Sequence, residues 1–396
     1  MLAVDYVAER FGPRLLIVHP SGRFVYLANW DSNDISAFRI DPASGALITV
    51  PGTRFPSGAN PRAVTVDPTG RFLYAANWGD HTLSAYRIDP DDGMLVETAG
   101  SPYPTGKNPR NARLDPAGRF AYVANRGSHD ISAFRVDPVT GALTALANSR
   151  VPTGPRPRSV MVHPTGTFAF TCHERSNLVS AYRISAATGD LIPAPGSPFR
   201  AGSDPRFVTV DPIGLFAYVP NQRSNAVSAY CIDLDTGSLT PVPGAPFKTG
   251  RRPFQMLVDH TGRFAYVANE KSHTLSGYEI DRDTGALVPL PGTPIPTGRH
   301  PIWPTIDPTG RFIYVANKKS NDVSAYVMDS GTGRLSPVPG SPFPAGTGPR
   351  AIIVTPSGMF AYLGNEGSDD VSGYCIDPKT GALSPVPGSP FPAGLI

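Results

Sequence analysis

Residues 61–103 read PRAVTVDPTGRFLYAANWGDHTLSAYRIDPDDGMLVETAGSPY, and this stretch decides the fold. Its first six residues alternate apolar and polar side chains, a pattern typical of a half-buried strand. The DPTG at 67–70 follows as a tight turn, in which proline sets φ and glycine ends the turn. Apolar runs at 72–77, 83–88 and 94–96 are separated by further polar turns. The stretch therefore predicts four consecutive antiparallel strands.

The same unit recurs along the whole chain. Its turn glycine returns every 48 residues, at Gly22, Gly70, Gly118, Gly166, Gly214, Gly262, Gly310 and Gly358. Eight units counted from Gly12 contain no insertion, deletion or linker. We therefore expect residues 12–396 to form one domain of eight repeats, with residues 1–11 packing on or beside the last repeat.

Four antiparallel strands at a period of 40–50 residues are typical of a β-propeller blade. The sequence predicts an all-β, eight-bladed β-propeller, and a seven-bladed ring with an accessory repeat is the alternative. The fourth strand is rich in proline, as at 241–243, and proline confines it to the outer edge of the blade. The first strand then lies at the axis. The loops that follow the second and fourth strands share one end of the ring, called the top face below.

The composition excludes several classes of protein. The 396 residues include 40 Gly and 45 Pro, which interrupt helices and rule against an α-rich fold. Charged residues are 17% of the chain and the net charge is +3, so we expect no nucleic-acid partner. No apolar run is long enough to span a membrane. Three cysteines are too few for a disulfide framework.

These observations also suggest where the protein acts. The first residues, MLAVDYVAER, carry acids and lack the apolar core of a signal peptide. We expect a cytoplasmic protein, or a periplasmic or secreted one if a leader has been removed. A monomer that binds a small anionic molecule is the expected state.

The tetrapeptide YVAN stands at 122–125, 266–269 and 314–317, within a frame of Pro-Arg, DPTGRF and Ser-Ala-Tyr. This frame resembles the YVTN-type, lactonase-like propellers of the 6-phosphogluconolactonase and carboxymuconate-cyclase group. The resemblance covers essentially the whole chain. It implies a propeller that acts on a small molecule, and we expect no cofactor. Members of this group usually have seven blades, whereas this sequence has eight complete units.

An arginine follows the proline that opens the inner strand in six of the repeats. These residues are expected to bind substrate around the top of the axial opening, and they are Arg14, Arg62, Arg110, Arg158, Arg206 and Arg350. A guanidinium group binds carboxylate or phosphate through two parallel hydrogen bonds, and like charges in a narrow opening concentrate anions. The alternative interpretation is structural, with each arginine bonded to backbone carbonyls of its own or the next blade.

Two repeats break the series of arginines. The sixth has Phe254 and Gln255 at this point, and the seventh has Ile302 and Trp303. We predict that Phe254, Gln255 and Trp303 bind substrate on an apolar side of the opening, because a charged arc facing an apolar wall orients a small amphiphilic anion. Sequence drift in a wet channel is the alternative. In the third repeat, Asn111 and Arg113 replace smaller residues and are expected to face the channel.

The fourth repeat carries the candidate catalytic residues His173 and Glu174. Nearby guanidinium groups should lower the pKa of His173 and favour its neutral, base-competent form. Glu174 could orient this imidazole or compete for the arginines. The alternative is structural, because His173 fills a loop-capping slot that is asparagine in the other repeats: Asn29, Asn77, Asn125, Asn221, Asn269, Asn317 and Asn365.

Glutamates follow the capping slot on alternate repeats, at Glu174, Glu270 and Glu366. They could neutralise the arginines, or hold a divalent cation as a secondary alternative. No spacing typical of a zinc or calcium site is present, so we assign no metal ligand.

The leading hypothesis is a lactonase-like enzyme acting on a small anionic cyclic or sugar-derived substrate by hydrolysis or isomerisation. The arginines would hold the anion and stabilise the developing oxyanion, and His173 with Glu174 would transfer the proton. The alternative, favoured by the near-identity of the repeats, is a non-catalytic propeller that binds a ligand or a protein on its top face.

Overall fold

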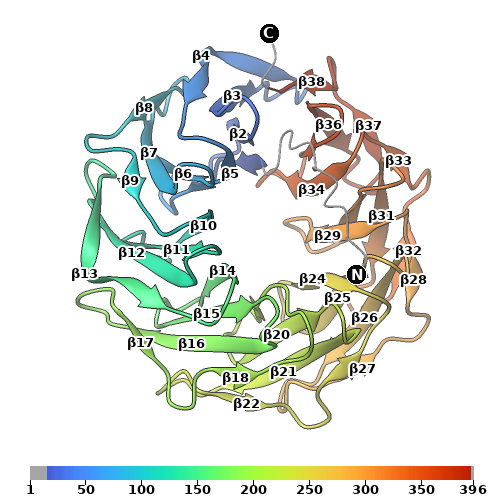
Figure 1. Ribbon diagram of the computed structural model, residues 1–396. Coiled ribbons are helices and arrows are strands. Elements are labelled where there is room, and N and C mark those ends of the chain that lie inside the picture. Colours follow the sequence, from blue (N-terminus) through green and yellow to red (C-terminus); the bar gives the residue numbers. More distant parts are fainter. Residues whose placement is uncertain (1–15, 394–396) are drawn as a thin grey trace, which may run out of the picture.

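The structure, a computed structural model, describes residues 16–393. Eight antiparallel sheets surround a central opening, each facing the axis with its first strand (Figure 1). This arrangement confirms the predicted eight-bladed propeller. The range 16–393 contains no helix, and hence no helical segment that could cross a bilayer.

Each blade contains four main strands, hydrogen-bonded in chain order from the axis outward. The inner strands are β1 (Leu16–Val18), β5 (Pro61–Val66), β10 (Pro109–Leu114), β14 (Pro157–Val162), β19 (Thr209–Val210), β24 (Pro253–Val258), β29 (Pro301–Ile306) and β34 (Pro349–Val354). The second strands are β2 (Phe24–Asn29), β6 (Phe72–Asn77), β11 (Phe120–Asn125), β15 (Phe168–His173), β20 (Phe216–Asn221), β25 (Phe264–Asn269), β30 (Phe312–Asn317) and β35 (Phe360–Asn365).

The third strands are β3 (Asp34–Ile40), β7 (Thr82–Ile88), β12 (Asp130–Val136), β16 (Leu178–Ile184), β21 (Ala226–Ile232), β26 (Thr274–Ile280), β31 (Asp322–Met328) and β36 (Asp370–Ile376). The outer strands are β4 (Leu47–Pro56), β8 (Leu95–Glu97), β13 (Leu143–Pro152), β17 (Leu191–Pro193), β22 (Leu239–Pro241), β27 (Leu287–Pro289), β32 (Leu335–Pro337) and β37 (Leu383–Pro385).

The proline-rich segment forms the outer edge, as predicted. In six blades a cis X–Pro bond interrupts this edge, and the chain then pairs with the third strand again. These short strands are β9 (Tyr103–Pro104), β18 (Phe199–Arg200), β23 (Phe247–Lys248), β28 (Ile295–Pro296), β33 (Phe343–Pro344) and β38 (Phe391–Pro392). Blades one and three lack that bond and each have one continuous outer strand. On these strands Arg54 pairs with Asp34, and Arg150 pairs with Asp130.

The blades pack on one another through a repeated contact. The hydroxyl of Tyr26 donates to the carbonyl of Gly93 in the next blade over 2.9 Å. Gly93 has a φ of +81°, and a Cβ there would lie 2.4 Å from the ring of Phe24. Only glycine fits this turn, because its φ is positive and the ring occupies the space of a side chain. The junction therefore holds the two blades in close contact.

The last blade meets the first through the same contact. Tyr362 donates to the carbonyl of Gly45 over 2.6 Å, and the ring of Phe360 covers Gly45. Phe360 and Tyr362 share one buried cluster with Leu16 and Val18 of β1. Within the described range, every sheet is formed by one continuous segment of chain. Among the described residues, side-chain packing and the Tyr362 bond join the last blade to the first. The predicted position of residues 1–11 lies outside the described residues.

We predict that Tyr362→Phe lowers the free energy of unfolding by about 1–2 kcal/mol, because it leaves the buried Gly45 carbonyl without its donor. Tyr314→Phe, which removes the matching bond to Gly381 inside the ring, serves as the reference. Urea unfolding of both variants measures the difference. A Tyr362→Phe variant as stable as the wild type, beside a destabilised Tyr314→Phe, would contradict this closure.

Candidate functional site

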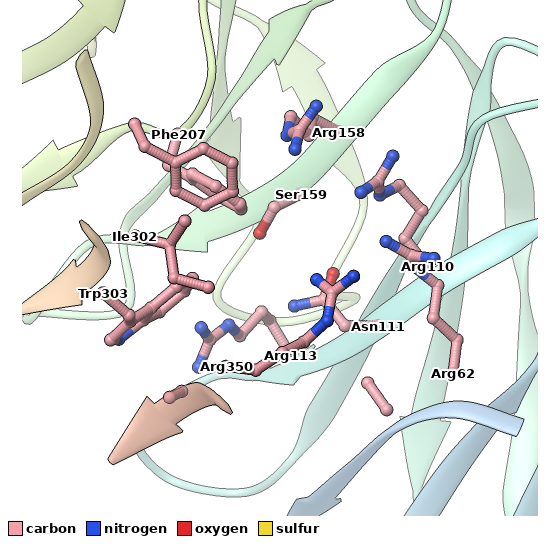
Figure 2. Close-up of a pocket in the computed structure, with 13 residues that line it drawn as sticks. Arg62, Arg110, Asn111, Arg113, Arg158, Ser159, Phe207, Ile302, Trp303 and Arg350 are labelled. Atoms are coloured by element: carbon pink, nitrogen blue, oxygen red, sulfur yellow. The ribbon is translucent and has the colours of Figure 1, made fainter. Parts of the chain in front are cut away.

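A cavity of about 150 Å³ lies in the axial channel. Residues of seven inner-strand segments line it, from the second blade to the eighth: Arg62, Ala63, Arg110, Asn111, Arg113, Arg158, Ser159, Phe207, Phe254, Ile302, Trp303, Arg350 and Ala351. Figure 2 shows the labelled aromatic side chains on one side of this space and most guanidinium groups on the other. The eight inner strands converge on the axis, so side chains distant in sequence meet there.

The apolar side of the cavity is a packed group of rings. Phe207 meets Trp303 edge-on at 5.4 Å between ring centroids and lies 5.8 Å from Phe254. The Arg158 guanidinium lies 5.0 Å from the centroid of Phe207, within the range of a cation–π contact. The aromatic wall and the cationic side are therefore continuous, with Arg158 at their boundary.

Glu174 does not line the cavity itself, but it pairs with Arg110 and Arg158, which do. Its carboxylate accepts hydrogen bonds from Arg126, at 2.9 and 3.0 Å, and from Arg158. Arg110 and Arg206 approach the same carboxylate at 3.6 and 3.8 Å. Burial alone raises the pKa of Glu174, but the guanidinium groups outweigh that effect and lower it to about 2. Glu174 is therefore ionised at neutral pH.

This cluster has more positive charge than negative. Glu174 is the single carboxylate paired with its four guanidinium groups among the described residues. Burial, with repulsion from Arg158, lowers the pKa of Arg206 to about 9 and shifts the pKa of Arg110 well below its usual value. Unbalanced buried charge is costly, so an anion that enters the cavity gains from hydrogen bonds to charged donors.

The other two glutamates are also engaged by neighbours. Glu270 accepts from Gln222 at 2.6 Å and lies 2.5 Å from His300 Nε2. Glu366 lies 2.5 Å from Arg350 and 3.1 Å from Lys318. Among the residues that the structure describes, no three His, Cys, Asp or Glu side chains are grouped closely enough to hold a metal ion. Binding of a divalent cation near these glutamates stays a prediction.

His173 occupies the slot that asparagine fills in the other blades. Its Nε2 lies 2.8 Å from Ser180 Oγ, the contact that Asn125 makes with Ser132. The side chain is fully buried and does not line the cavity. Burial lowers the pKa of His173 to about 4, whereas the sequence suggested guanidinium groups as the cause. The imidazole is therefore neutral at pH 7.

The remaining predicted residues divide into three groups. Arg62, Arg110, Arg158, Arg350, Phe254 and Trp303 line the cavity. Arg206 and Gln255 do not line it: the Arg206 guanidinium lies 5.1 Å from the centroid of the Phe254 ring, and Gln255 donates to the carbonyl of Met256. Arg14 lies outside the described residues.

Phe207 is the large lining residue that the sequence analysis missed, beside the small Ala63, Ser159 and Ala351. Its equivalents Ala63 and Ser159 are small, so a bulky ring at this point was the available signal. The inner strand of blade five pairs only at Thr209–Val210, with one isolated bridge from Pro205 to Asn221. Arg206 N–H still donates to the carbonyl of Pro220, and Phe207 lines the channel as its equivalents Ser159 and Trp303 do.

The chain belongs to the family described as Lactonase, 7-bladed beta-propeller, which matches residues 16–109, 103–203, 157–300 and 293–390. The matched segments cover almost all of the described range, although this ring has eight blades. Comparison with curated proteins finds no match to the sequence.

Solved structures share the fold at low identity. The periplasmic gluconolactonase of Pseudomonas aeruginosa is 20% identical, with a TM-score of 0.61 over 93% of this chain and 96% of that one. A protein from Bacteroides uniformis, proposed to be a 6-phosphogluconolactonase, is 21% identical, with a TM-score of 0.62 over 83% of this chain and 96% of that one. Hydrazine synthase of Kuenenia stuttgartiensis is 18% identical, with a TM-score of 0.57 over 96% of this chain and 99% of that one.

The cluster around Glu174 predicts an anion-dependent stability. Glu174→Gln, which copies Gln222 of the next blade, leaves four guanidinium groups without their carboxylate and should cost about 3–5 kcal/mol. Added sulfate should restore more stability to this variant than to the wild type, because an anion bound to the native state stabilises it. Thermal unfolding in sulfate and in chloride at equal ionic strength measures the effect. Glu279→Gln, at an exposed glutamate, is the control, and equal sulfate effects in all three proteins would contradict the prediction.

His173 predicts a pH dependence of stability. The unfolded histidine, with a pKa near 6.5, binds a proton before the folded one does at about 4, so the wild type should lose stability as pH falls from 6.5 to 4. The loss should be on the order of 3 kcal/mol. His173→Asn, which restores the residue of the other blades, should lack this loss. Urea unfolding across this pH range measures both proteins, and parallel curves would contradict the prediction.

Proposed function

We propose that this lactonase-family propeller is an enzyme acting on a small anionic cyclic or sugar-derived substrate in the axial channel, by hydrolysis or isomerisation. The single observation that carries the proposal is the cavity, in which an excess of guanidinium groups faces a wall of aromatic rings. The relatives named as gluconolactonases support a lactone as the substrate class.

The charge distribution supports entry of the anion from the top face. Arg223, Arg251, Arg252 and Lys271 lie on the top loops around the channel. The turns at the opposite end carry aspartates whose pKa values are lowered by hydrogen bonds from backbone N–H groups and from Ser or Thr hydroxyls, the Thr332 hydroxyl being the largest cause at Asp329; they include Asp41, Asp137, Asp233, Asp281, Asp329 and Asp377. A positive mouth with a low-dielectric wall concentrates anionic ligands and speeds their encounter.

In the proposed reaction Arg110 and Arg158 hold the anionic group or stabilise the oxyanion that develops as water attacks the lactone carbonyl. Phe207 and Trp303 pack against the ring of the substrate and exclude bulk water. Glu174 orients the guanidinium groups, because an ionised carboxylate with a pKa of about 2 is a weak base. Donors held in place by such a carboxylate need no reorganisation during the reaction.

Proton transfer by His173 is the step that the sequence predicted and that turnover can test. His173 contacts Ser180 and is fully buried, so it would need to act through an intervening group or a water. The turnover of His173→Asn distinguishes the two interpretations. Unchanged turnover assigns His173 to the capping slot, and a loss of more than about 100-fold assigns it to proton transfer.

A non-catalytic propeller is the second candidate. The repetition of the blades favours it, as does a hollow of about 550 Å³ on the top face, lined by Asp204, Gln222, Arg223, Asn225, Arg251, Arg252 and Lys271. A binding protein of this kind would need no lactonase activity and would depend on these loop residues rather than on the channel.

We predict that the wild type hydrolyses 6-phosphogluconolactone with a higher kcat/KM than the uncharged gluconolactone. Arg110→Met should lower kcat/KM for the phosphorylated lactone by roughly 100-fold, because it removes one donor to the developing charge. A pH-stat assay with both lactones measures these rates.

Arg71→Thr is the matched control for this assay. Arg71 is exposed at the bottom of the ring, and the equivalent residue of blade four is Thr167. Loss of a positive charge there should leave kcat/KM unchanged. Absence of lactone hydrolysis, or equal losses in the two variants, would contradict the proposed function.

A further inference from the structure

Blade three presents two polar side chains to the channel that the proposed reaction does not use. Asn111 and Arg113 both line the cavity, because alternate residues of β10 point to the same side. Ala112, between them, is 1% exposed and packs into the sheet. Figure 2 shows Asn111 and Arg113 as neighbouring sticks beside Arg350. The inner strand of this blade therefore carries a polar pair below its mouth arginine.

In the other described blades, the residues equivalent to Arg113 and Asn111 are all uncharged. Arg113 pairs in register with Tyr122, as Thr65 does with Tyr74. Its equivalents in the other blades are Ile17, Thr65, Met161, Thr209, Leu257, Thr305 and Ile353. The described equivalents of Asn111 are Ala63, Ser159, Phe207, Gln255, Trp303 and Ala351. A charge at the position of Arg113 is thus specific to blade three.

Arg113 differs from the paired arginines at the mouth. Arg110 and Arg158 contact Glu174, and Arg350 contacts Glu366. Arg113 makes no hydrogen bond or ion pair with another described residue, and it is exposed to the open channel. The protein around the channel lowers its pKa by partial desolvation. The Oδ1 atom of Asn111 is likewise buried without a hydrogen-bond partner. Both side chains therefore retain their capacity to bind a ligand.

We propose that Asn111 and Arg113 form a second oxyanion subsite, below the Glu174 cluster, that binds a second acidic group of the channel ligand. The Arg113 guanidinium group offers parallel donors to a carboxylate or phosphate, and the Asn111 amide oxygen can accept from a neighbouring hydroxyl of the ligand. Arg113 follows Arg110 by three residues, and the irregular pairing between Pro109 and Ala112 shortens the rise below the roughly 10 Å of a regular strand. The two acidic groups therefore belong to the opposite ends of a ligand no longer than an open six-carbon acid.

The inference rests on the proposed function only for the presence of the ligand in the channel. It predicts that the protein prefers diacids to monoacids of the same length. Arg113 is then a residue that determines specificity and does not take part in the reaction itself.

Isothermal titration with D-gluconate and D-glucarate tests this subsite. The two acids share six carbons and differ in one carboxylate. The wild type should bind glucarate at least about 10-fold more tightly, the effect of one hydrogen-bonded charge. Arg113→Thr, which copies Thr65, should bind both acids with nearly equal affinity and should bind gluconate as the wild type does. Arg113→Met, which copies Met161, gives a second variant should the first fail to fold.

Arg71→Thr is again the matched control, because it removes the same charge far from the channel and should keep the preference for glucarate. Equal affinities of the wild type for the two acids, or no binding of either, would overturn the inference. Equal losses for both acids in the Arg113 variants would do the same, because they would reveal only a general effect of charge. A wild type that prefers glucarate but hydrolyses no lactone would overturn the proposed function and leave the subsite in place.

Discussion

The contact on which the rest of the structure depends is the junction between neighbouring blades. A buried tyrosine of one blade donates to a glycine carbonyl of the next, and a phenylalanine of the first blade covers that same glycine. Blade four keeps the covering ring, Phe168, but has Phe170 in place of the tyrosine. The covering ring recurs at all eight steps and the tyrosine bond at seven of them, including the step from Tyr362 to Gly45 that closes the ring.

Ring closure has an electrostatic consequence. Arg110, Arg158 and Arg206 each follow the first proline of a repeat and lie 48 residues apart in the chain, yet they gather with Arg126 around one carboxylate. In an extended chain these charges would be screened by water. In the narrow channel they are partly desolvated, and Glu174 balances only part of the charge. The resulting excess of positive charge is the property on which the proposed chemistry depends.

Much of the fold could be predicted from the sequence. The regular spacing of the turn glycines indicated eight blades, and the proline-rich segment indicated the outer edge; both predictions are confirmed. The site was less predictable. Arg110, Arg158, Phe254 and Trp303 were identified because they repeat or break the pattern at the inner strand. Phe207 was missed, because it follows Arg206, which keeps the arginine pattern, so no break in that pattern marked it, unlike its equivalent Trp303.

The sequence by itself determined the blade, the number of blades and the residues available at the axis, because these follow from contacts that are local and repeated. Only the tertiary structure decided which side chains share a partner. It put His173 against Ser180, four arginines against Glu174, and Arg113 in the channel without a described partner. The physical reason is that these contacts join side chains of different blades, and the distance between such side chains depends on the diameter of the ring and on how each inner strand pairs. Neither quantity is encoded in a single repeat.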